Sequence, residues 1–326
     1  MLKLRVLACG VVASFALVGC GTGEAPYQWN EYALAGTYSA SISESGRFAA
    51  IGSFNHGGSL WLVSRHARQF DWNHAAGDLS LIKAVGFSPD DNYAMTADQQ
   101  TMVLWKTDTG APEGFWSAPA EILELDLSPQ GDFALLGLAN HTAVYFDAKN
   151  GGERQVFRHQ GRVESVDLSN DASLALTGSS DYKATLWNVE TAEKLHTLEF
   201  DNIVDTVAIS PNNNLAFTSA SLDKAVIWDT KTGKVKHTLS DIESLFAKRM
   251  SYLSADFSKD GSKLLTGSAS GLVQLWDVRS GKLLKSWRMH KRDAYGPVDT
   301  GVYAVSFSRT GAYYALGSNG IMNTLR

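Results

Sequence analysis

A serine ends a short apolar segment seven times along this 326-residue chain, and this repeat constrains the fold more than any other feature. Successive serines are separated by 45, 40, 41, 41, 48 and 50 residues, and a bulky aromatic residue follows each of the first six by 17 or 18 residues. A period near 40 residues is typical of a repeat architecture. The seven serines are Ser43, Ser88, Ser128, Ser169, Ser210, Ser258 and Ser308.

The fourth copy illustrates the composition of one unit. Its short segments 165–169, 174–179, 184–188 and 194–198 are rich in strand-forming residues, and Asn, Asp, Gly and Ser separate them. These separators are the residues that make tight turns. Alternate apolar positions in the first segment of each copy would face one shared core. The sequence therefore predicts an all-β chain.

Three of the segments carry a resemblance to a known family. Residues 186–188 (Leu-Trp-Asn), 227–229 (Ile-Trp-Asp) and 275–277 (Leu-Trp-Asp) resemble the closing strand of WD-repeat (β-transducin-like) β-propellers. The resemblance extends over about residues 36–326 in seven copies. It implies a seven-bladed β-propeller whose blades are four-stranded antiparallel sheets around a central channel.

Members of that family often join a His, a strand hydroxyl, a turn Asp and the Trp in a hydrogen-bonded network within a blade. Only the fourth copy carries the whole set at the expected spacing. We interpret the set as structural rather than ligand-binding. The residues are His159, Thr177 or Ser179, Asp181 and Trp187.

The seventh copy has three strand segments, and a segment near the N-terminus is expected to supply the fourth. Residues 27–34 are aromatic and extended in character and resemble residues 68–72, which occupy the fourth-strand position of the first copy. An open ring would leave an unpaired sheet edge, which proteins avoid. The alternative is that residues 27–34 form a disordered tether.

The N-terminus is similar to a bacterial lipoprotein signal. Lys3 and Arg5 precede an apolar stretch, residues 6–18, that is too short to span a bilayer as a helix. Leu17-Val18-Gly19-Cys20 resembles the lipobox, which implies a signal peptide over residues 1–19 and lipidation of Cys20. Residues 20–26 would form a flexible tether and residues 27–326 the propeller. The expected location is the outer membrane, facing the periplasm.

Charge and motif content exclude several function classes. The net charge of −5 becomes −7 without Lys3 and Arg5, which argues against a nucleic-acid partner. The eight His residues show no metal-ligand spacing, so neither a metal nor a cofactor is expected. Residues 231–233 (Lys-Thr-Gly) mimic a penicillin-binding motif but occupy a repeat turn. Most acidic residues occupy positions typical of turns. A catalytic pair of carboxylates in the channel remains an open alternative.

The longest spacings mark two insertions as the expected partner-binding face. Residues 240–252 carry a capping-box pattern with an apolar helical face, and residues 289–297 form a second long link. Aromatic and basic residues favour interfaces. The alternative is that the first insertion packs on the blade rim and the second is solvated. The predicted binding residues are Phe246, Lys248, Arg249, Tyr252, His290, Lys291, Arg292 and Tyr295.

The sequence thus predicts a monomeric, non-enzymatic, lipid-anchored scaffold that binds a protein partner at the bacterial cell envelope. A second hypothesis is an assembly factor of outer-membrane biogenesis. A third, less favoured, is a propeller enzyme with an active site in the channel.

Overall fold

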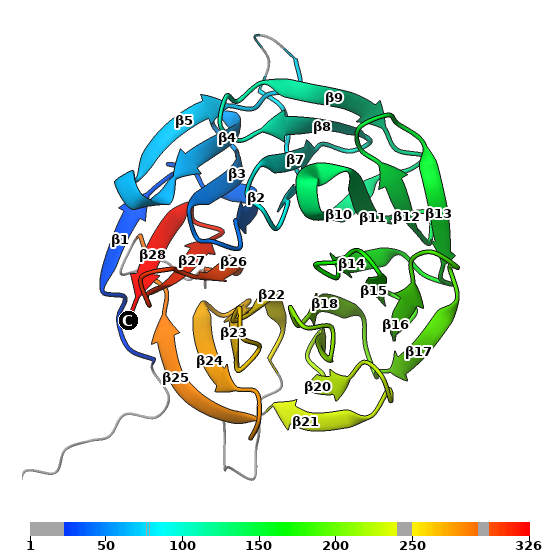
Figure 1. The fold of residues 1–326 in the computed structure, drawn as a ribbon. Helices are drawn as coiled ribbons and strands as arrows, with labels where there is room; N and C mark the ends of the chain where they lie inside the picture. Colours follow the sequence, from blue (N-terminus) through cyan, green and yellow to red (C-terminus); the bar gives the residue numbers. More distant parts are fainter. Residues whose placement is uncertain (1–22, 76, 78, 240–249, 293–299) are drawn as a thin grey trace, which may run out of the picture.

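The computed structural model describes residues 23–75, 77, 79–239, 250–292 and 300–326. Seven four-stranded antiparallel sheets are arranged as blades in a ring around a central channel (Figure 1). Each inner strand lines the channel, and each outer strand lies on the rim. The predicted all-β, seven-bladed propeller is confirmed.

The strands of each blade run from the channel outward in chain order, except that the outer strand of blade seven comes from the N-terminus. Blade one holds β2 (Thr37–Ile42), β3 (Phe48–Ser53), β4 (Gly57–Leu62) and β5 (Ala67–Asp71). Blade two holds β6 (Ala84–Phe87), β7 (Tyr93–Ala97), β8 (Thr101–Lys106) and β9 (Pro112–Ser117). Blade three holds β10 (Ile122–Leu127), β11 (Phe133–Leu138), β12 (Thr142–Asp147) and β13 (Glu153–Arg158). Blade four holds β14 (Val163–Leu168), β15 (Leu174–Ser179), β16 (Lys183–Asn188) and β17 (Lys194–Glu199). Blade five holds β18 (Val204–Ile209), β19 (Leu215–Ala220), β20 (Ala225–Asp229) and β21 (Val235–Leu239). Blade six holds β22 (Tyr252–Phe257), β23 (Lys263–Ser268), β24 (Leu272–Asp277) and β25 (Lys282–Arg288). Blade seven holds β26 (Val302–Phe307), β27 (Tyr313–Gly317), β28 (Ile321–Leu325) and β1 (Gln28–Glu31). Two 3₁₀ turns, η1 (Val63–Arg65) and η2 (Pro129–Gly131), complete the described elements.

The repeat serine closes the turn between the first and second strands of its blade. In blade four, Ser169 is buried, its backbone N–H donates to the carbonyl of Leu174, and its Oγ accepts the N–H of Leu174 at 2.9 Å. The same contact joins Ser258 to Lys263 at 2.9 Å. A buried hydroxyl that satisfies a turn N–H in the first six repeats explains why serine recurs at this position, whereas Ser308 is half-buried and accepts the N–H of Thr310 at 2.9 Å.

The core lies between blades. Blades two and three, for example, share one cluster of buried residues that includes Met95, Leu104, Leu125, Leu136 and Phe146. Strand β12 is buried along its whole length. Because each blade buries both faces against its neighbours, the ring stabilises itself only when it is closed.

Strand β1 closes the ring. It pairs antiparallel with β28, with Gln28 opposite Thr324 and Glu31 opposite Ile321, and Figure 1 shows the two strands side by side near the C-terminus. The strand lies within the range 27–34 considered from the sequence. Beyond it, Tyr32 donates its N–H to the carbonyl of Gly320 at 2.8 Å. Gly320 has a φ of +75°, and a Cβ there would lie 2.3 Å from the carbonyl oxygen of Ala33.

The predicted signal peptide, Cys20 and four of the predicted binding residues lie outside the described residues. Those four are Phe246, Lys248, Arg249 and Tyr295. Within the part of the chain that the structure describes, no helix has the length and apolar character needed to cross a membrane.

Candidate functional site

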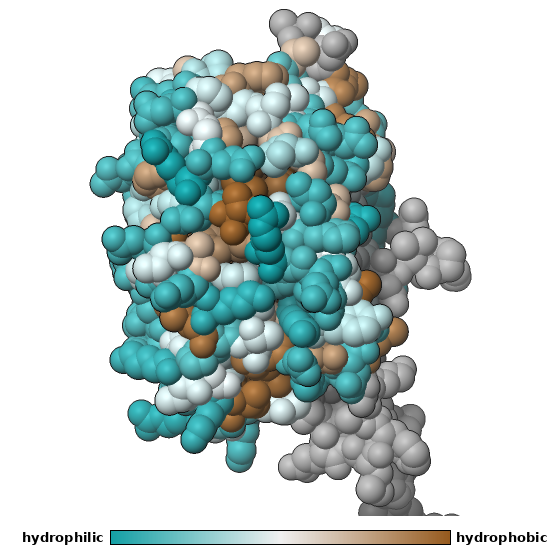
Figure 2. Space-filling view, turned by 90° about the vertical axis from the view of Figure 1, so that its right-hand side faces the viewer, coloured by the Kyte–Doolittle hydropathy of each residue, from teal (hydrophilic) through white to brown (hydrophobic). Residues whose placement is uncertain are grey.

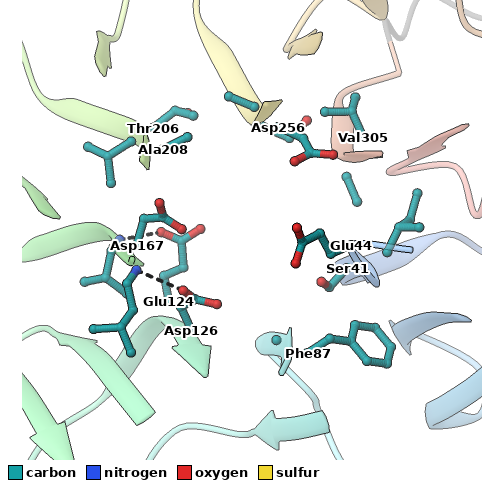
Figure 3. Close-up of a pocket in the computed structure, with 18 of the residues that line it drawn as sticks. Ser41, Glu44, Phe87, Glu124, Asp126, Asp167, Thr206, Ala208, Asp256 and Val305 are labelled. Atoms are coloured by element: carbon teal, nitrogen blue, oxygen red, sulfur yellow. Dashed lines mark hydrogen bonds between the residues drawn. The ribbon is translucent and has the colours of Figure 1, made fainter. Parts of the chain in front are cut away.

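The central channel contains a cavity of about 250 Å³ to which the inner strands of all seven blades contribute. Five carboxylates line it, and none of the described lining residues is Lys, Arg or His. In Figure 3, Glu124, Asp126 and Asp167 form one group on the side of blades three and four, and Glu44 and Asp256 lie across the channel from it. The cavity is therefore strongly acidic.

The inner strands position these carboxylates because each inner strand has an open edge. Its N–H groups would lack partners, and side chains of the preceding blade accept them. Glu124 accepts the N–H of Val166 at 2.8 Å, and Asp126 accepts that of Leu168 at 2.9 Å. Asp167 accepts the N–H of Ile209 in the same way. Each of these contacts uses one oxygen of its carboxylate.

Burial makes these groups hard to ionise. It raises the pKa of Glu124 to about 7 and that of Asp256 to about 8. It also raises the pKa of Asp126 to about 6 and raises that of Asp167, which the charge of Asp126 raises further. Enclosure by protein disfavours the charged form, although all four side chains keep partial contact with the channel. A cationic ligand would lower these pKa values.

One end of the channel has an apolar side and an acidic side. We call it the link end, because the links from each blade to the next arrive there. Near the starts of their inner strands, blades six, seven and one contribute Leu253, Tyr303 and Tyr38. Tyr38 is 41 % exposed and lies 3.7 Å, ring to ring, from Phe54, which is 48 % exposed.

Blades four and five place acidic residues at the equivalent positions, Glu164 and Asp205. Burial raises the pKa of Asp205 to about 6, and its Oδ1 is buried with no hydrogen-bond partner. The equivalent residue of blade two, Lys83, forms an ion pair with Glu121 at 2.8 Å. A buried acceptor without a donor is rare in proteins.

The carboxylates are spread around the channel rather than gathered about one point. No group of three or more His, Cys, Asp or Glu side chains among the described residues could hold a metal ion. The geometry instead suits an ammonium or guanidinium group, which binds carboxylates through several N–H donors.

The structure corrects the assignment of Tyr252 to the binding surface. Its side chain is 3 % exposed, its hydroxyl donates to Gln274 at 3.0 Å, and its ring packs edge-on against Phe217. The residue starts the inner strand β22, where the strand period turns it into the core between blades. Tyr252 is thus a core residue.

Two other predicted binding residues make intramolecular contacts at the ring closure. The His290 ring stacks on Trp29 with 4.0 Å between centroids. Arg292 donates to the carbonyl oxygens of Ala33 at 2.7 Å and Asn319 at 3.0 Å, and lies 3.6 Å from Glu31. Lys291 is half-buried between them. These contacts fasten the closing segment to blade seven.

The predicted network of blade four is joined by hydrogen bonds. His159 Nε2 lies 2.7 Å from Thr177 Oγ1, Trp187 donates to the same oxygen at 2.8 Å, and His159 Nδ1 lies 3.1 Å from Asp181. Ser179 accepts the backbone N–H of Asp181 at 3.1 Å. Burial lowers the pKa of His159, so the ring is neutral at pH 7. The network holds the blade together and is remote from the cavity.

Blade two corrects the expectation that only one copy has the complete set. His74 Nε2 lies 2.9 Å from Thr96 Oγ1, Trp105 donates to Thr96 at 2.8 Å, and Asp98 lies 3.5 Å from His74 Nδ1. His74 stands 14 residues before its repeat serine, whereas His159 stands ten before its own. Because the link before blade two is longer, the spacing that identifies the set in blade four does not find it in blade two.

The channel carboxylates were missed, although a signal for them exists in the sequence. Asp126, Asp167 and Asp256 each stand two residues before their repeat serine. A strand position that repeats in register around a propeller lines the channel, so an Asp at this position in three copies predicts an acidic lining.

The fold and the channel define a β-propeller with an acidic central cavity. Two segments, residues 151–188 and 248–277, match the family model described as WD domain, G-beta repeat. The seven four-stranded blades agree with this similarity to WD40-repeat β-propellers. Such propellers are usually non-catalytic scaffolds that bind proteins. A comparison with curated proteins found no match.

Proposed function

We propose that the protein is a lipid-anchored scaffold of a bacterial cell envelope that binds a protein partner at the link end of its channel. The lipobox-like residues 17–20 support the anchor and the location. The partner would present a Lys or Arg flanked by apolar residues. Its basic side chain would enter the channel, and its apolar neighbours would contact Leu253, Tyr303 and Tyr38.

The observation that carries this proposal is the set of five carboxylates in a cavity without a cationic lining residue among those described. Buried carboxylates are stabilised by a partner of opposite charge. The apolar side of the link end adds area that a flat acidic surface would lack, and aromatic anchors dominate protein interfaces.

A random peptide library displayed on phage and selected on the purified protein tests the proposal. The selected peptides should carry a Lys or Arg between apolar residues. Their affinity should fall about tenfold or more in the double variant Asp126→Asn/Asp167→Asn, which replaces two channel carboxyl groups by amides of the same shape.

The matched control is Asp171→Asn/Asp260→Asn, which removes two carboxylates from turns between strands rather than from the channel lining. This control should bind the peptides as the natural protein does. Selected peptides without a basic residue, or equal losses in the two double variants, would reject the channel as the binding site.

A further inference from the structure

We propose that the outer wall of blades six and seven lies against the anionic headgroups of a lipid bilayer. This wall, which we call the six–seven wall, comprises residues 23–31, β25 and Arg326. The expected closeness of this wall to the bilayer rests on the proposed lipid anchor at Cys20. The affinity of the wall for anionic lipid is tested separately below.

The chain is fixed to this wall from residue 23 onward. Glu24 donates its N–H to the carbonyl of Ser286 at 2.8 Å and accepts the N–H of Arg288 at 2.9 Å, and Lys285 pairs with its carboxylate at 2.9 Å. A Cβ on Gly23 would lie 2.7 Å from the carbonyl carbon of Trp287. Gly23 therefore lies directly against β25.

Only three peptide units separate Gly23 from Cys20. Consecutive Cα atoms lie 3.8 Å apart, so the two Cα atoms are at most about 11 Å from each other. A lipid on Cys20 would thus hold the six–seven wall close to the bilayer, because the intervening chain is too short for the propeller to stand away from it.

The wall carries aromatic side chains suited to an interface. Tyr27 is 62 % exposed and Trp29 is 46 % exposed. The Arg326 guanidinium lies 3.8 Å from the centroid of the Tyr27 ring. Tyr and Trp are enriched at the headgroup level of membranes, because each ring is largely apolar but carries a polar group that hydrogen-bonds to water.

Its charge is opposite to that of the chain as a whole. Five cationic side chains lie on or beside the wall against the two carboxylates Glu24 and Glu31, while the chain has a net charge of −5. Juxtamembrane Lys and Arg bind anionic lipid. Figure 2 shows the opposite side of the ring, where hydrophilic residues dominate and hydrophobic ones form small separate patches. The cations are Lys282, Lys285, Arg288, Arg292 and Arg326.

The first arm of the test uses the lipidated protein from membranes, with mass spectrometry to establish the acyl chains on Cys20. Cys9 and Cys20 are the only cysteines, so after signal removal and lipidation an introduced cysteine is the only free thiol. A fluorescent dye on Tyr27→Cys should be quenched by nitroxide lipids in phosphatidylglycerol-containing vesicles. A dye on Phe115→Cys, which is exposed on blade two, should not be quenched.

The second arm does not depend on the lipid. A form beginning at residue 20 with Cys20→Ser, which keeps every described residue, is measured for binding to phosphatidylglycerol vesicles. Neutralising Lys282 and Arg288 to Gln should weaken binding roughly 30-fold. Lys183→Gln/Lys194→Gln on blade four, with the same change of charge, should leave binding almost unchanged.

The outcomes separate the two proposals. An unacylated Cys20 with vesicle binding through Lys282 and Arg288 would reject the anchor and support the wall. If Cys20 is acylated but dyes at positions 27 and 115 are quenched equally, the proposal that the six–seven wall faces the bilayer is overturned. The proposed lipid anchor is then supported. The proposal for the six–seven wall would also be overturned if vesicle binding is absent or if both pairs of substitutions weaken it equally.

Discussion

The channel wall and the six–seven wall both solve the problem of an open sheet edge, but with different groups and opposite residual charge. In the channel, carboxylates of one blade accept the N–H groups of the next blade. At the rim of blade seven, the backbone of the N-terminal segment covers the edge of β28. Side-chain capping leaves an acidic cavity, and backbone capping leaves the rim free to carry aromatic and basic residues. Pairing of the sheet edge does not fix the charge of the wall, so the charge of each wall can suit what it binds.

Removal of the backbone cap is expected to have the largest effect. Deletion of residues 27–34 removes the strand pairing of β1 and the buried residues Tyr32 and Ala33, and should lower the free energy of unfolding by about 3–5 kcal/mol. Thermal and urea unfolding measure this. As a control, a Gly-Ser segment of eight residues inserted before Gly23 lengthens the tether and should leave stability unchanged. An unchanged melting temperature in the deletion would mean that the segment serves only as a tether.

Removal of a side-chain cap should have a smaller effect. Asp126→Asn retains an oxygen that accepts the N–H of Leu168, whereas Asp126→Ala does not. Both substitutions remove the charge, so their difference isolates the hydrogen bond. The Ala variant should be less stable than the Asn variant by about 1 kcal/mol in urea unfolding. Equal stability would show that water in the channel replaces the cap.

Titration of the channel should give the most specific effect. The pKa of Asp256, about 8, lies above that of an aspartate in an unfolded chain, about 4. The folded protein therefore binds the extra proton between these values, and its stability falls as the pH rises through them. Asp256→Asn avoids this loss, so its melting temperature relative to the natural protein should rise by about 5 °C from pH 5 to pH 8.

Asp171→Asn provides the opposite case for that titration. Burial opposes ionisation of Asp171, but hydrogen bonds from Ser173 and Ser169 lower its pKa to about 2. Its contribution to stability is present above about pH 4 and is lost only as the pH falls toward 2. Asp171→Asn should therefore lower the melting temperature equally at pH 5 and pH 8. A constant difference for Asp256→Asn as well would show that the channel carboxylates ionise normally.

Much of the fold was accessible from the sequence because the propeller repeats its local chemistry. The serine recurs in every copy and is buried in the first six, so its period predicts the number of blades. Features that depend on link length were less accessible. The network around His74 is displaced by four residues, and Tyr252 was assigned to a link although it begins a core strand.

The candidate site was harder to predict because one residue type serves two purposes. Asp171 and Asp126 are both aspartates near a repeat serine, but one caps a turn and the other faces the channel. The side of the serine separates them, because Asp126 stands two residues before Ser128 in the inner strand and Asp171 two residues after Ser169 in the turn. Likewise, Arg292 has the composition of a binding residue, yet its side chain fastens the closing segment to blade seven.

Site-specific photo-crosslinking in living cells tests the central claim most directly, namely that the link end of the channel holds a protein partner. A photoreactive phenylalanine replaces Tyr303 at the link end or Phe115 on the rim of blade two. We expect a discrete protein adduct from position 303, strongly reduced in the Asp126→Asn/Asp167→Asn background, and none from position 115. An adduct that forms equally well from position 115, or that persists unchanged without the two channel carboxyl groups, would contradict the account.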